Sequence, residues 1–275
     1  MKNLKQYNES SIDFYNLVVC SKRNPHLKQR LSLLTQLIKI SFEDYDNKFA
    51  NNNLRQLKKT NSQNCSKSDF DELYKFRSKP FQDFLINLRS IQEVTIANTC
   101  QYCTINSHHT LDHFLPKSDY WEYIAHPKNL IPSCSDCNSR RGYEADLSLN
   151  LYLDQLPELQ YLFVDIFLED EDINFEFYIK NINGINQIIY NKIIYHFKEL
   201  NLLERMKLSA INHFTEFYNL VINQLRVTDW ENIKLTTVRS VYNNKNAYGH
   251  NHWKYILQES LINNEVFKIK CLGSI

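Results

Sequence analysis

Glycine is scarce in this chain, occurring four times in 275 residues, whereas average usage is about 7%. Glycine adopts positive φ most readily, so we expect few positions of positive φ, few glycine-dependent tight turns and a helix-rich fold. The sequence also lacks an uncharged apolar run of about 18 residues, the length that spans a bilayer. The first ten residues, MKNLKQYNES, contain no apolar segment of the kind that directs secretion. A soluble, cytoplasmic protein is expected.

Net charge is nearly absent as well, at +1 for the whole chain. This balance argues against non-specific adhesion to nucleic acid over the entire surface. The distribution is uneven, however, because residues 1–95 contain 16 Lys and Arg against 10 Asp and Glu, and the remainder is acidic. A locally basic third of the chain is compatible with phosphate contacts.

The spacing of apolar residues predicts an α+β fold that is mostly helical. Apolar positions three and four apart predict two helices within residues 12–60, separated near Asn24 and Pro25. The polar stretch 60–68, TNSQNCSKS, predicts a loop, and a helical pattern resumes over residues 69–96.

The later part of the chain combines helices with a strand. Residues 147–166 are apolar and predicted to be partly helical, until the acidic run 169–172 interrupts them. Apolar and polar residues then alternate with period two over 173–180, which is typical of a half-buried strand, and a turn-prone stretch follows at 181–184. Residues 186–226 are predicted to form one long helix or two consecutive ones.

Cysteine usage gives the first sharp signal of function. The chain has seven cysteines, and an odd number in a reducing compartment argues against a disulfide framework. Cys20, Cys65 and Cys271 are isolated, and Cys20 lies in an apolar stretch where a small buried hydrophobe is expected. A two-residue gap lets both sulfurs of a C-x-x-C pair turn onto one ion, which predicts a structural zinc site. The four cysteines in two such pairs are Cys100, Cys103, Cys134 and Cys137.

The two cysteine pairs are separated by 30 residues, whereas a simple zinc ribbon has about 15 to 20 between them. Asp112 and His113 lie in this insert, Asn129 follows them, and Asn138 comes directly after the second pair. This segment, from 100 to 142, resembles the HNH endonuclease family. The family has an acidic residue and a histidine at the end of one strand, an asparagine in the following loop, and a histidine or asparagine on a helix. The cysteine pairs stand as in its zinc-stapled, four-cysteine branch.

The chemistry of these residue types supports a role for each. Phosphodiester hydrolysis needs a water deprotonated near neutral pH, so His113 is the candidate general base. A cation must neutralise the charge that builds up on the phosphate, and Asp112 and Asn138 offer oxygen ligands. Asp112 and His113 can share a site only if their strand ends or bends, which Pro116 favours. Because Asn138 replaces a second histidine, magnesium or manganese is expected rather than zinc or nickel. The resemblance implies that Asn129 holds the loop and orients the histidine.

Candidate nucleic-acid contacts are Arg140, Arg141 and Lys117. Guanidinium groups make forked contacts with phosphate oxygens, although a solvated helix face is the alternative for the two arginines. His109 and His113 are four apart and would bind a metal together on a helix, but their surroundings favour a loop for His108 and His109.

The sequence therefore predicts a basic helical region over 1–95, an HNH nuclease module of the ββα-metal type over 96–148, and a mostly helical region with a short strand over 149–275. The expected function is metal-dependent hydrolysis of DNA, with RNA left open. Zinc has a structural role and magnesium or manganese a catalytic one. By family resemblance, DNA of phages or mobile elements is the leading target. Two alternatives stay open: a non-catalytic zinc module that binds nucleic acid or protein, and a nuclease subunit active only with a partner. A partner protein and a homodimer are both compatible with the sequence.

Overall fold

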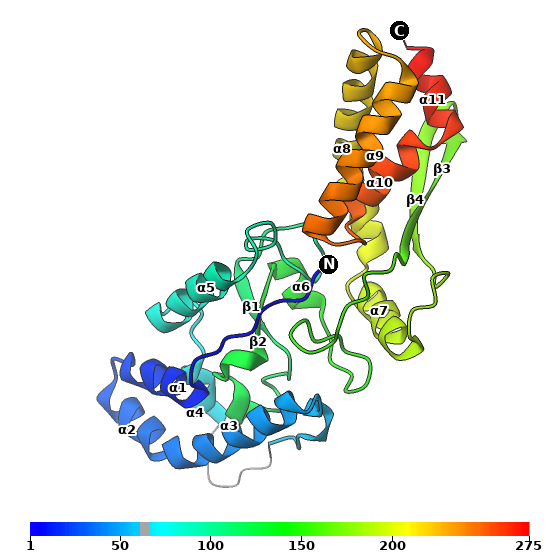
Figure 1. Ribbon diagram of the computed structural model, residues 1–275. Helices are drawn as coiled ribbons and strands as arrows, with labels where there is room; N and C mark the ends of the chain where they lie inside the picture. Colours follow the sequence, from blue (N-terminus) through cyan, green and yellow to red (C-terminus); the bar gives the residue numbers. More distant parts are fainter. Residues whose placement is uncertain (61–66, 275) are drawn as a thin grey trace. The chain divides into compact units, whose positions relative to one another are not determined.

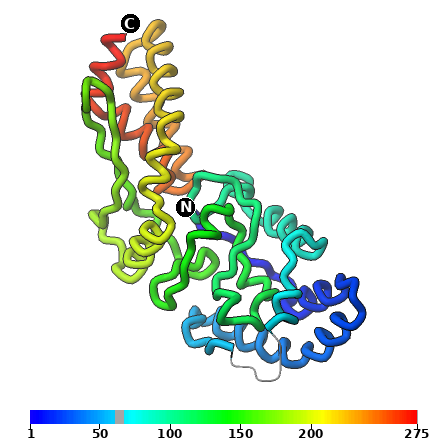
Figure 2. Tube along the Cα trace, turned by 180° about the vertical axis from the view of Figure 1, so that it is seen from behind, coloured from blue at the N-terminus to red at the C-terminus, as the bar shows by residue number. Residues whose placement is uncertain are grey.

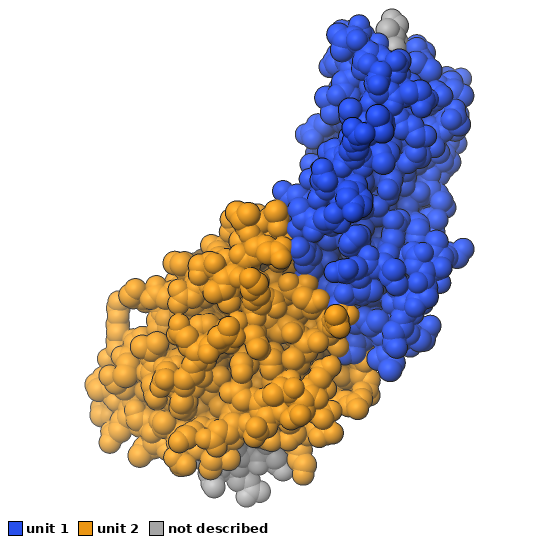
Figure 3. All heavy atoms as spheres, in the orientation of Figure 1, with its two compact units in different colours: residues 1–2, 103–105, 156–275 blue, residues 3–102, 106–155 orange. Residues whose placement is uncertain are grey.

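The computed structural model describes residues 1–60 and 67–274. Helices predominate, and the described strands form two small antiparallel sheets, which confirms the mostly helical α+β class (Figure 1). Contacts divide the chain into two compact units, coloured separately in Figure 3. We call residues 3–102 and 106–155 the N-terminal unit; residues 1–2, 103–105 and 156–275 form the C-terminal unit. Within the part of the chain described here, no helix combines the length and apolar character needed to cross a membrane.

Five α-helices precede the cysteine pairs in the N-terminal unit. The break expected at Asn24 and Pro25 is confirmed, because Asn24 caps a helix that has Pro25 in its first turn. The helix expected after residue 68 begins slightly earlier and is split in two. Residues 61–66, which include Cys65 and most of the predicted loop, lie outside the described residues. The helices are α1 (Ser11–Cys20), α2 (Pro25–Leu33), α3 (Thr35–Ala50), α4 (Lys67–Leu73) and α5 (Lys79–Ile91).

Aromatic side chains form the core between α1, α5 and the first residues of the unit. The rings of Tyr7 and Phe84 lie 5.0 Å apart, and those of Phe14 and Phe81 lie 5.4 Å apart in an edge-to-face arrangement. The amide of Leu4 also donates to the carbonyl of Leu151 at 3.0 Å. These contacts join the basic helical region to the residues after position 100, so the first two regions expected from the sequence share one compact unit.

A β-hairpin and a short helix form the centre of the N-terminal unit. Strand β1 (Thr110–His113) pairs antiparallel with β2 (Leu130–Ser133), with His113 opposite Leu130. Helix α6 (Ser135–Arg140) follows β2 directly and packs against β1. The connection between the strands includes two short 3-10 helices, η2 (Trp121–Tyr123) and η3 (Pro127–Asn129). The ββα arrangement predicted for the central module is thus confirmed.

The C-terminal unit is a long hairpin packed on helices. Figures 1 and 2 both show β3 (Leu162–Glu169) and β4 (Asp172–Ile179) alongside α8 and α10. The predicted strand over 173–180 is confirmed as β4, and the two consecutive helices within 186–226 are confirmed as α7 and α8. The helices are α7 (Gln187–Glu199), α8 (Leu202–Leu225), α9 (Trp230–Tyr248), α10 (Trp253–Ile262) and α11 (Glu265–Leu272).

The expectation of helix within residues 147–166 is wrong. These residues form turns and then enter β3, which pairs with β4 along its whole length. Pairing with a partner strand satisfies the backbone of this apolar run, and that partner cannot be inferred from the run itself.

Positive φ is more common than the glycine count suggested. Among the described residues, positive φ occurs at five positions other than glycine, which are Asn52, Thr104, Asp170, Glu171 and Asn201. Asparagine and aspartate tolerate this conformation better than most residues, so they stand where glycine would be usual.

The prediction that Cys20 is buried is also wrong, since its side chain is exposed. The buried residues of α1 include Phe14, Tyr15, Val18 and Val19. Cys20 is the last residue of the helix and falls outside that buried stripe.

Candidate active site

The four cysteines of the two C-x-x-C pairs come together. Their Sγ atoms all lie within 4.8 Å of one another, and all four residues are buried. A tetrahedral zinc with Zn–S bonds of about 2.3 Å needs sulfurs about 3.8 Å apart, so the cluster fits zinc. The amide of Ile105 donates to the Sγ of Cys103 at 3.4 Å, which favours a thiolate. The cluster therefore has the ligand type, number and spacing of a structural zinc site, and its members are Cys100, Cys103, Cys134 and Cys137.

His113 is the last residue of β1, where the hairpin ends. Its Nε2 lies 2.9 Å from the carbonyl oxygen of Ile124. A carbonyl only accepts hydrogen bonds, so in the neutral ring Nε2 carries the proton and Nδ1 holds the lone pair. Burial lowers the pKa of His113 to about 4, opposed by the bond to Ile124 and reinforced by the positive charge of Lys117. The ring is therefore neutral at pH 7 and has a defined nitrogen available as a base.

Tyr74, a residue from the helical region before the module, packs on the histidine. Its ring lies 4.5 Å from that of His113 in an edge-to-face contact, and its hydroxyl donates to the carbonyl of Leu111 at 3.0 Å. The residue follows α4 directly, so the N-terminal helices help to position the end of β1.

Asn129 holds the connection between the two strands. The side chain is completely buried. Its Oδ1 accepts from the amide of Leu115 at 2.8 Å, and its Nδ2 donates to the carbonyls of Leu115 and Tyr123 at 3.2 and 3.1 Å. Tyr123 immediately precedes Ile124, the residue whose carbonyl accepts from His113. Asn129 is therefore hydrogen-bonded to both sides of the loop that carries the acceptor of His113.

Asp112 is buried beside a positive charge. Its Oδ2 lies 2.9 Å from Nη1 of Arg141 and accepts from the hydroxyl of Tyr102 at 3.0 Å. Burial raises the pKa of Asp112, whereas Arg141 and Tyr102 act in the opposite direction. The backbone amide of His113 also donates to this carboxylate.

Arg141 points inward rather than toward solvent. Its side chain is 6% exposed, and Nη1 also approaches the carbonyls of His113 and Phe114 at 3.3 and 3.4 Å. The guanidinium lies 5.5 Å from the ring centre of Tyr102 and 5.1 Å from that of Phe114. Arg141 is the C-cap of α6, so it links the end of this helix to the end of β1.

Asn138 lies on α6, facing β1. Its Nδ2 donates to the hydroxyl of Thr110 at 3.2 Å and to the carbonyl of Leu111 at 3.4 Å. The amide is thus next to the backbone of the residue before Asp112. A carboxylate and an amide on adjoining elements form the kind of oxygen donor set that magnesium and manganese accept, with water completing the coordination.

The remaining candidates differ in exposure. Arg140 and Lys117 are exposed, and Lys117 Nζ lies 5.9 Å from the ring centre of Tyr74, close to the histidine. His108 is buried, with Nε2 2.7 Å from the carbonyl of Ala97. His109 is exposed and approaches Ser135 Oγ at 3.1 Å. The alternative of a metal site shared by His109 and His113 on a helix is overturned, because His113 lies in a strand and His109 immediately precedes it.

Sequence reasoning missed Tyr74 and Tyr102. Tyr102 lies inside the first cysteine pair, where its proximity to a zinc ligand was a usable signal. Tyr74 had no local signal, because its contact with His113 spans 39 positions of sequence and depends on how α4 packs.

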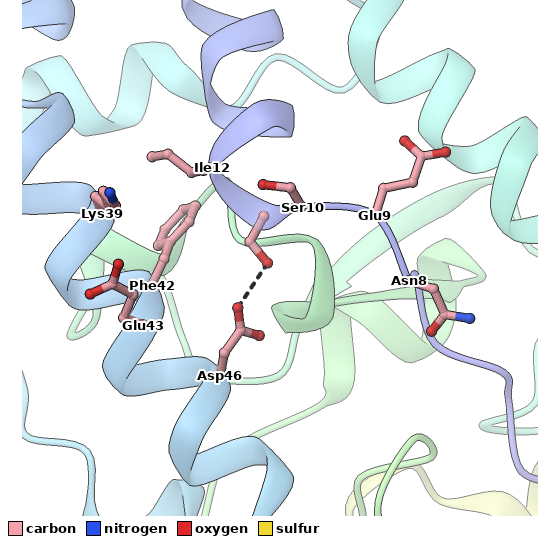
Figure 4. Close-up of a pocket in the computed structure, with 9 residues that line it drawn as sticks. Asn8, Glu9, Ser10, Ile12, Lys39, Phe42, Glu43 and Asp46 are labelled. Atoms are coloured by element: carbon pink, nitrogen blue, oxygen red, sulfur yellow. Dashed lines mark hydrogen bonds between the residues drawn. The ribbon is translucent and has the colours of Figure 1, made fainter.

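A separate pocket opens between α3 and the residues leading into α1 (Figure 4). Glu9, Glu43 and Asp46 line it, and Asp46 accepts from the hydroxyl of Ser11 at 3.2 Å. Lys39 is its single basic lining residue. The acidic lining repels phosphate, and no residue predicted for catalysis takes part in it, so this pocket is not the nuclease site.

A β-hairpin and a helix joined by four zinc-binding cysteines, with an Asp-His pair at the strand end, define a ββα-metal module. Residues 100–144 match the family model described as HNH endonuclease.

Two relatives extend the similarity beyond the module. Protein ea31 of Escherichia phage lambda is 24% identical over 235 residues, which cover 74% of this chain and 75% of the relative. Septu protein PtuB of Bacillus thuringiensis is 24% identical over 180 residues, covering 62% of this chain and 66% of the relative. No solved structure matches this chain.

Proposed function

We propose that this chain is a metal-dependent endonuclease that hydrolyses phosphodiester bonds of DNA. The observation that carries the proposal is the hydrogen bond of His113 Nε2 to the carbonyl of Ile124, at 2.9 Å. The bond leaves Nδ1 as the nitrogen that takes a proton from the attacking water. A module with a purely structural zinc does not need a neutral histidine whose tautomer is fixed by a backbone carbonyl.

One divalent cation, magnesium or manganese, completes the proposed site. Asp112 and Asn138 would hold it through their side-chain oxygens. When bound, such an ion neutralises the negative charge that develops on the phosphate and the leaving oxygen. Asn129 acts at a distance, by holding the loop that carries the acceptor of His113.

Exposed basic side chains near the histidine are the proposed contacts with the nucleic-acid backbone. Lys117 and Arg140 are exposed, and the basic region 1–95 adds further positive charge. Because much of that region belongs to the compact N-terminal unit, single substitutions test the proposed phosphate contacts better than truncation does, and Lys117 near the histidine is the first to change. Replacing Lys117 with Gln should reduce the slope of log K against log salt by about 0.9 on duplex DNA. An unchanged slope would place the binding surface elsewhere.

The decisive experiment compares two histidines. Purified protein is incubated with plasmid DNA, single-stranded DNA and RNA in magnesium or manganese. We expect cleavage by the wild type and by His109→Ala, an exposed neighbour outside the proposed mechanism, and none by His113→Ala. Zinc content and nucleic-acid binding should be the same for all three proteins. Cleavage by His113→Ala would show that His113 is not the general base. If all three proteins bind nucleic acid and none cleaves it, a non-catalytic zinc module is favoured.

Manganese separates the base from the metal ligands. Excess manganese should partly restore activity to Asn138→Ala, which loses one ligand, but not to His113→Ala, which loses the proton acceptor. Equal rescue of the two variants would contradict this division of roles.

A nuclease that needs a partner protein is the second candidate. The observation in its favour is the set of exposed apolar side chains on two helices of the C-terminal unit: Leu208, Ile211 and Leu220 on α8, and Leu235 and Tyr242 on α9. This candidate predicts weak cleavage in isolation and an increase when the partner is added. A second copy of the chain is included in the test by measuring activity against protein concentration.

We place the proposed activity in the bacterial cytoplasm, against DNA of phages or mobile elements. The support is that the two relatives come from a phage and from a bacterium. Expression of the wild type and of His113→Ala in a bacterium, followed by infection with a panel of phages, tests this role. Equal plaque numbers for both proteins with every phage would count against it.

A further inference from the structure

Arg141 pairs with Oδ2 of Asp112, one of the two proposed metal ligands. The pair is buried, with side chains 6% and 9% exposed, and the Nη1–Oδ2 distance is 2.9 Å. Tyr102 contacts the same oxygen at 3.0 Å. A candidate metal ligand is therefore already neutralised by a cation that belongs to the protein.

The guanidinium has little freedom to leave. It is hydrogen-bonded to the carbonyls of His113 and Phe114, and it lies between the rings of Tyr102 and Phe114. Buried pairs held by several further hydrogen bonds are costly to separate, because each partner would be left as an unpaired charge. Arg141 thus stays in place when a second cation approaches Asp112.

The charges of the site then decide how well a divalent cation binds. Asp112 and Arg141 sum to zero, and His113 is neutral at pH 7. A divalent cation brings two positive charges into a largely buried site next to a guanidinium, and like charges at short range in a medium of low dielectric repel strongly. A phosphodiester supplies a negative charge at the same place. The cation and the nucleic acid each reduce the electrostatic cost of binding the other.

We propose that Arg141 is a positioning residue that makes binding of the catalytic cation depend on the nucleic acid. The inference rests on the proposed metal-dependent nuclease function and names its regulation. In the absence of DNA, Arg141 keeps the affinity of Asp112 and Asn138 for manganese low. The phosphate backbone offsets the charge of Arg141 and raises this affinity, and linkage requires that manganese raise the affinity for DNA by the same factor.

The experiment measures manganese binding rather than cleavage. Free manganese is followed by electron paramagnetic resonance during titration of the zinc-loaded full chain in the His113→Ala background, which leaves DNA intact. Arg141→Gln removes the guanidinium charge beside Asp112, and Arg239→Gln removes an exposed arginine of α9, outside the proposed site, as the matched control. Without DNA, we expect Arg141→Gln to bind manganese about 10-fold more tightly than Arg239→Gln. Addition of a short DNA duplex should tighten binding in the chain that retains Arg141 and have little effect on Arg141→Gln.

Several outcomes would overturn the inference. One is equal manganese affinity for the two arginine variants without DNA, and another is an affinity in the Arg141 protein that DNA does not change. If Arg141→Gln loses zinc or its far-ultraviolet circular dichroism signal, that variant is unfolded and cannot be used. The test is then the manganese affinity of the protein that retains Arg141, measured with and without DNA. The proposed function can fail separately, because the two variants are compared without nucleic acid and without measuring hydrolysis.

Discussion

Replacement of Asn129 with alanine should destabilise the N-terminal unit and disable the site together. The side chain is completely buried and makes contacts with Leu115, Tyr123 and Tyr45. Each hydrogen bond contributes about 1 kcal/mol net, and a buried polar group left without a partner costs about 1–3 kcal/mol. The amide and carbonyl of Leu115 and the carbonyl of Tyr123 would all lose this partner. We expect the free energy of unfolding to fall by about 3–5 kcal/mol, a large part of the roughly 5–15 kcal/mol typical of a domain.

Urea unfolding followed by circular dichroism measures this loss, with Asn98→Ala as the control. Asn98 is exposed, and its change should stay within about 0.5 kcal/mol. In the native Asn129→Ala protein, displacement of the Ile124 carbonyl should also reduce kcat, by about 100-fold if the ring of His113 moves by about 1 Å. If the free energy of unfolding falls by less than about 1 kcal/mol, the hydrogen bonds of Asn129 are not what holds the loop.

Four further predictions follow from the described geometry. The purified chain should contain one tightly bound zinc, and chelation should unfold the central module of residues 96–148; elemental analysis giving less than half an equivalent would contradict this. His213 is buried, neither ring nitrogen has a hydrogen-bond partner among the described residues, Nδ1 lies 3.8 Å from Oε2 of Glu216, and burial lowers the pKa of the ring to about 4. Its unfolded pKa is about 6.5, so the unfolded state binds the extra proton, and up to about 3 kcal/mol of stability is lost as the pH falls from 6.5 to 4. His213→Leu should flatten that dependence, and an unchanged pH profile of urea unfolding would refute the assignment. Cys20→Ser should remove one rapidly reacting thiol from the native protein, as titration with a thiol reagent would show. On supercoiled plasmid, a single site should produce open circles before linear DNA, unless the protein dimerises on its substrate; linear product without that intermediate, from a protein shown to stay monomeric on DNA, would contradict this order.

The central module was predictable because its chemistry is local. Two C-x-x-C pairs specify a knuckle geometry, and the Asp112-His113 dipeptide followed by Pro116 indicates where the strand ends. The structure confirms the cysteine cluster and the hairpin with its following helix. The roles of the residues in catalysis remain predictions.

Strand β3 was not predictable from its own residues. Residues Leu162 to Leu168 are apolar except for Asp165 and do not alternate with period two, so the segment fits a helix as well as a strand. The connecting turn gave no signal either, because Asp170 and Glu171 adopt positive φ where hairpins usually have glycine or asparagine. Only pairing with β4 identifies the segment as a strand.

The contact between Arg141 and Asp112 could not be predicted from the sequence, for a different reason. An arginine after a cysteine knuckle on a short helix fits an exposed phosphate contact as well as an internal ion pair. The choice depends on the space between Tyr102 and Phe114, which receives the guanidinium. That space exists only once β1, α6 and the first cysteine pair have assembled.

The brevity of α6 has a consequence for the order of folding. A helix of six residues is too short to persist in an unfolded chain, because the cost of nucleation is not recovered over so few hydrogen bonds. Its first turn contains Cys137, and Arg141 caps its end. We expect Asn138 to reach its place only after both ends of the helix are fixed, one by the cysteine cluster and the other by the buried ion pair. We expect newly synthesised chains to pass through a zinc-free state in which the N-terminal helices are formed and the site is not. The supply of zinc would then determine when the proposed active site of each molecule forms. A cell short of zinc would accumulate protein in which this site is not formed.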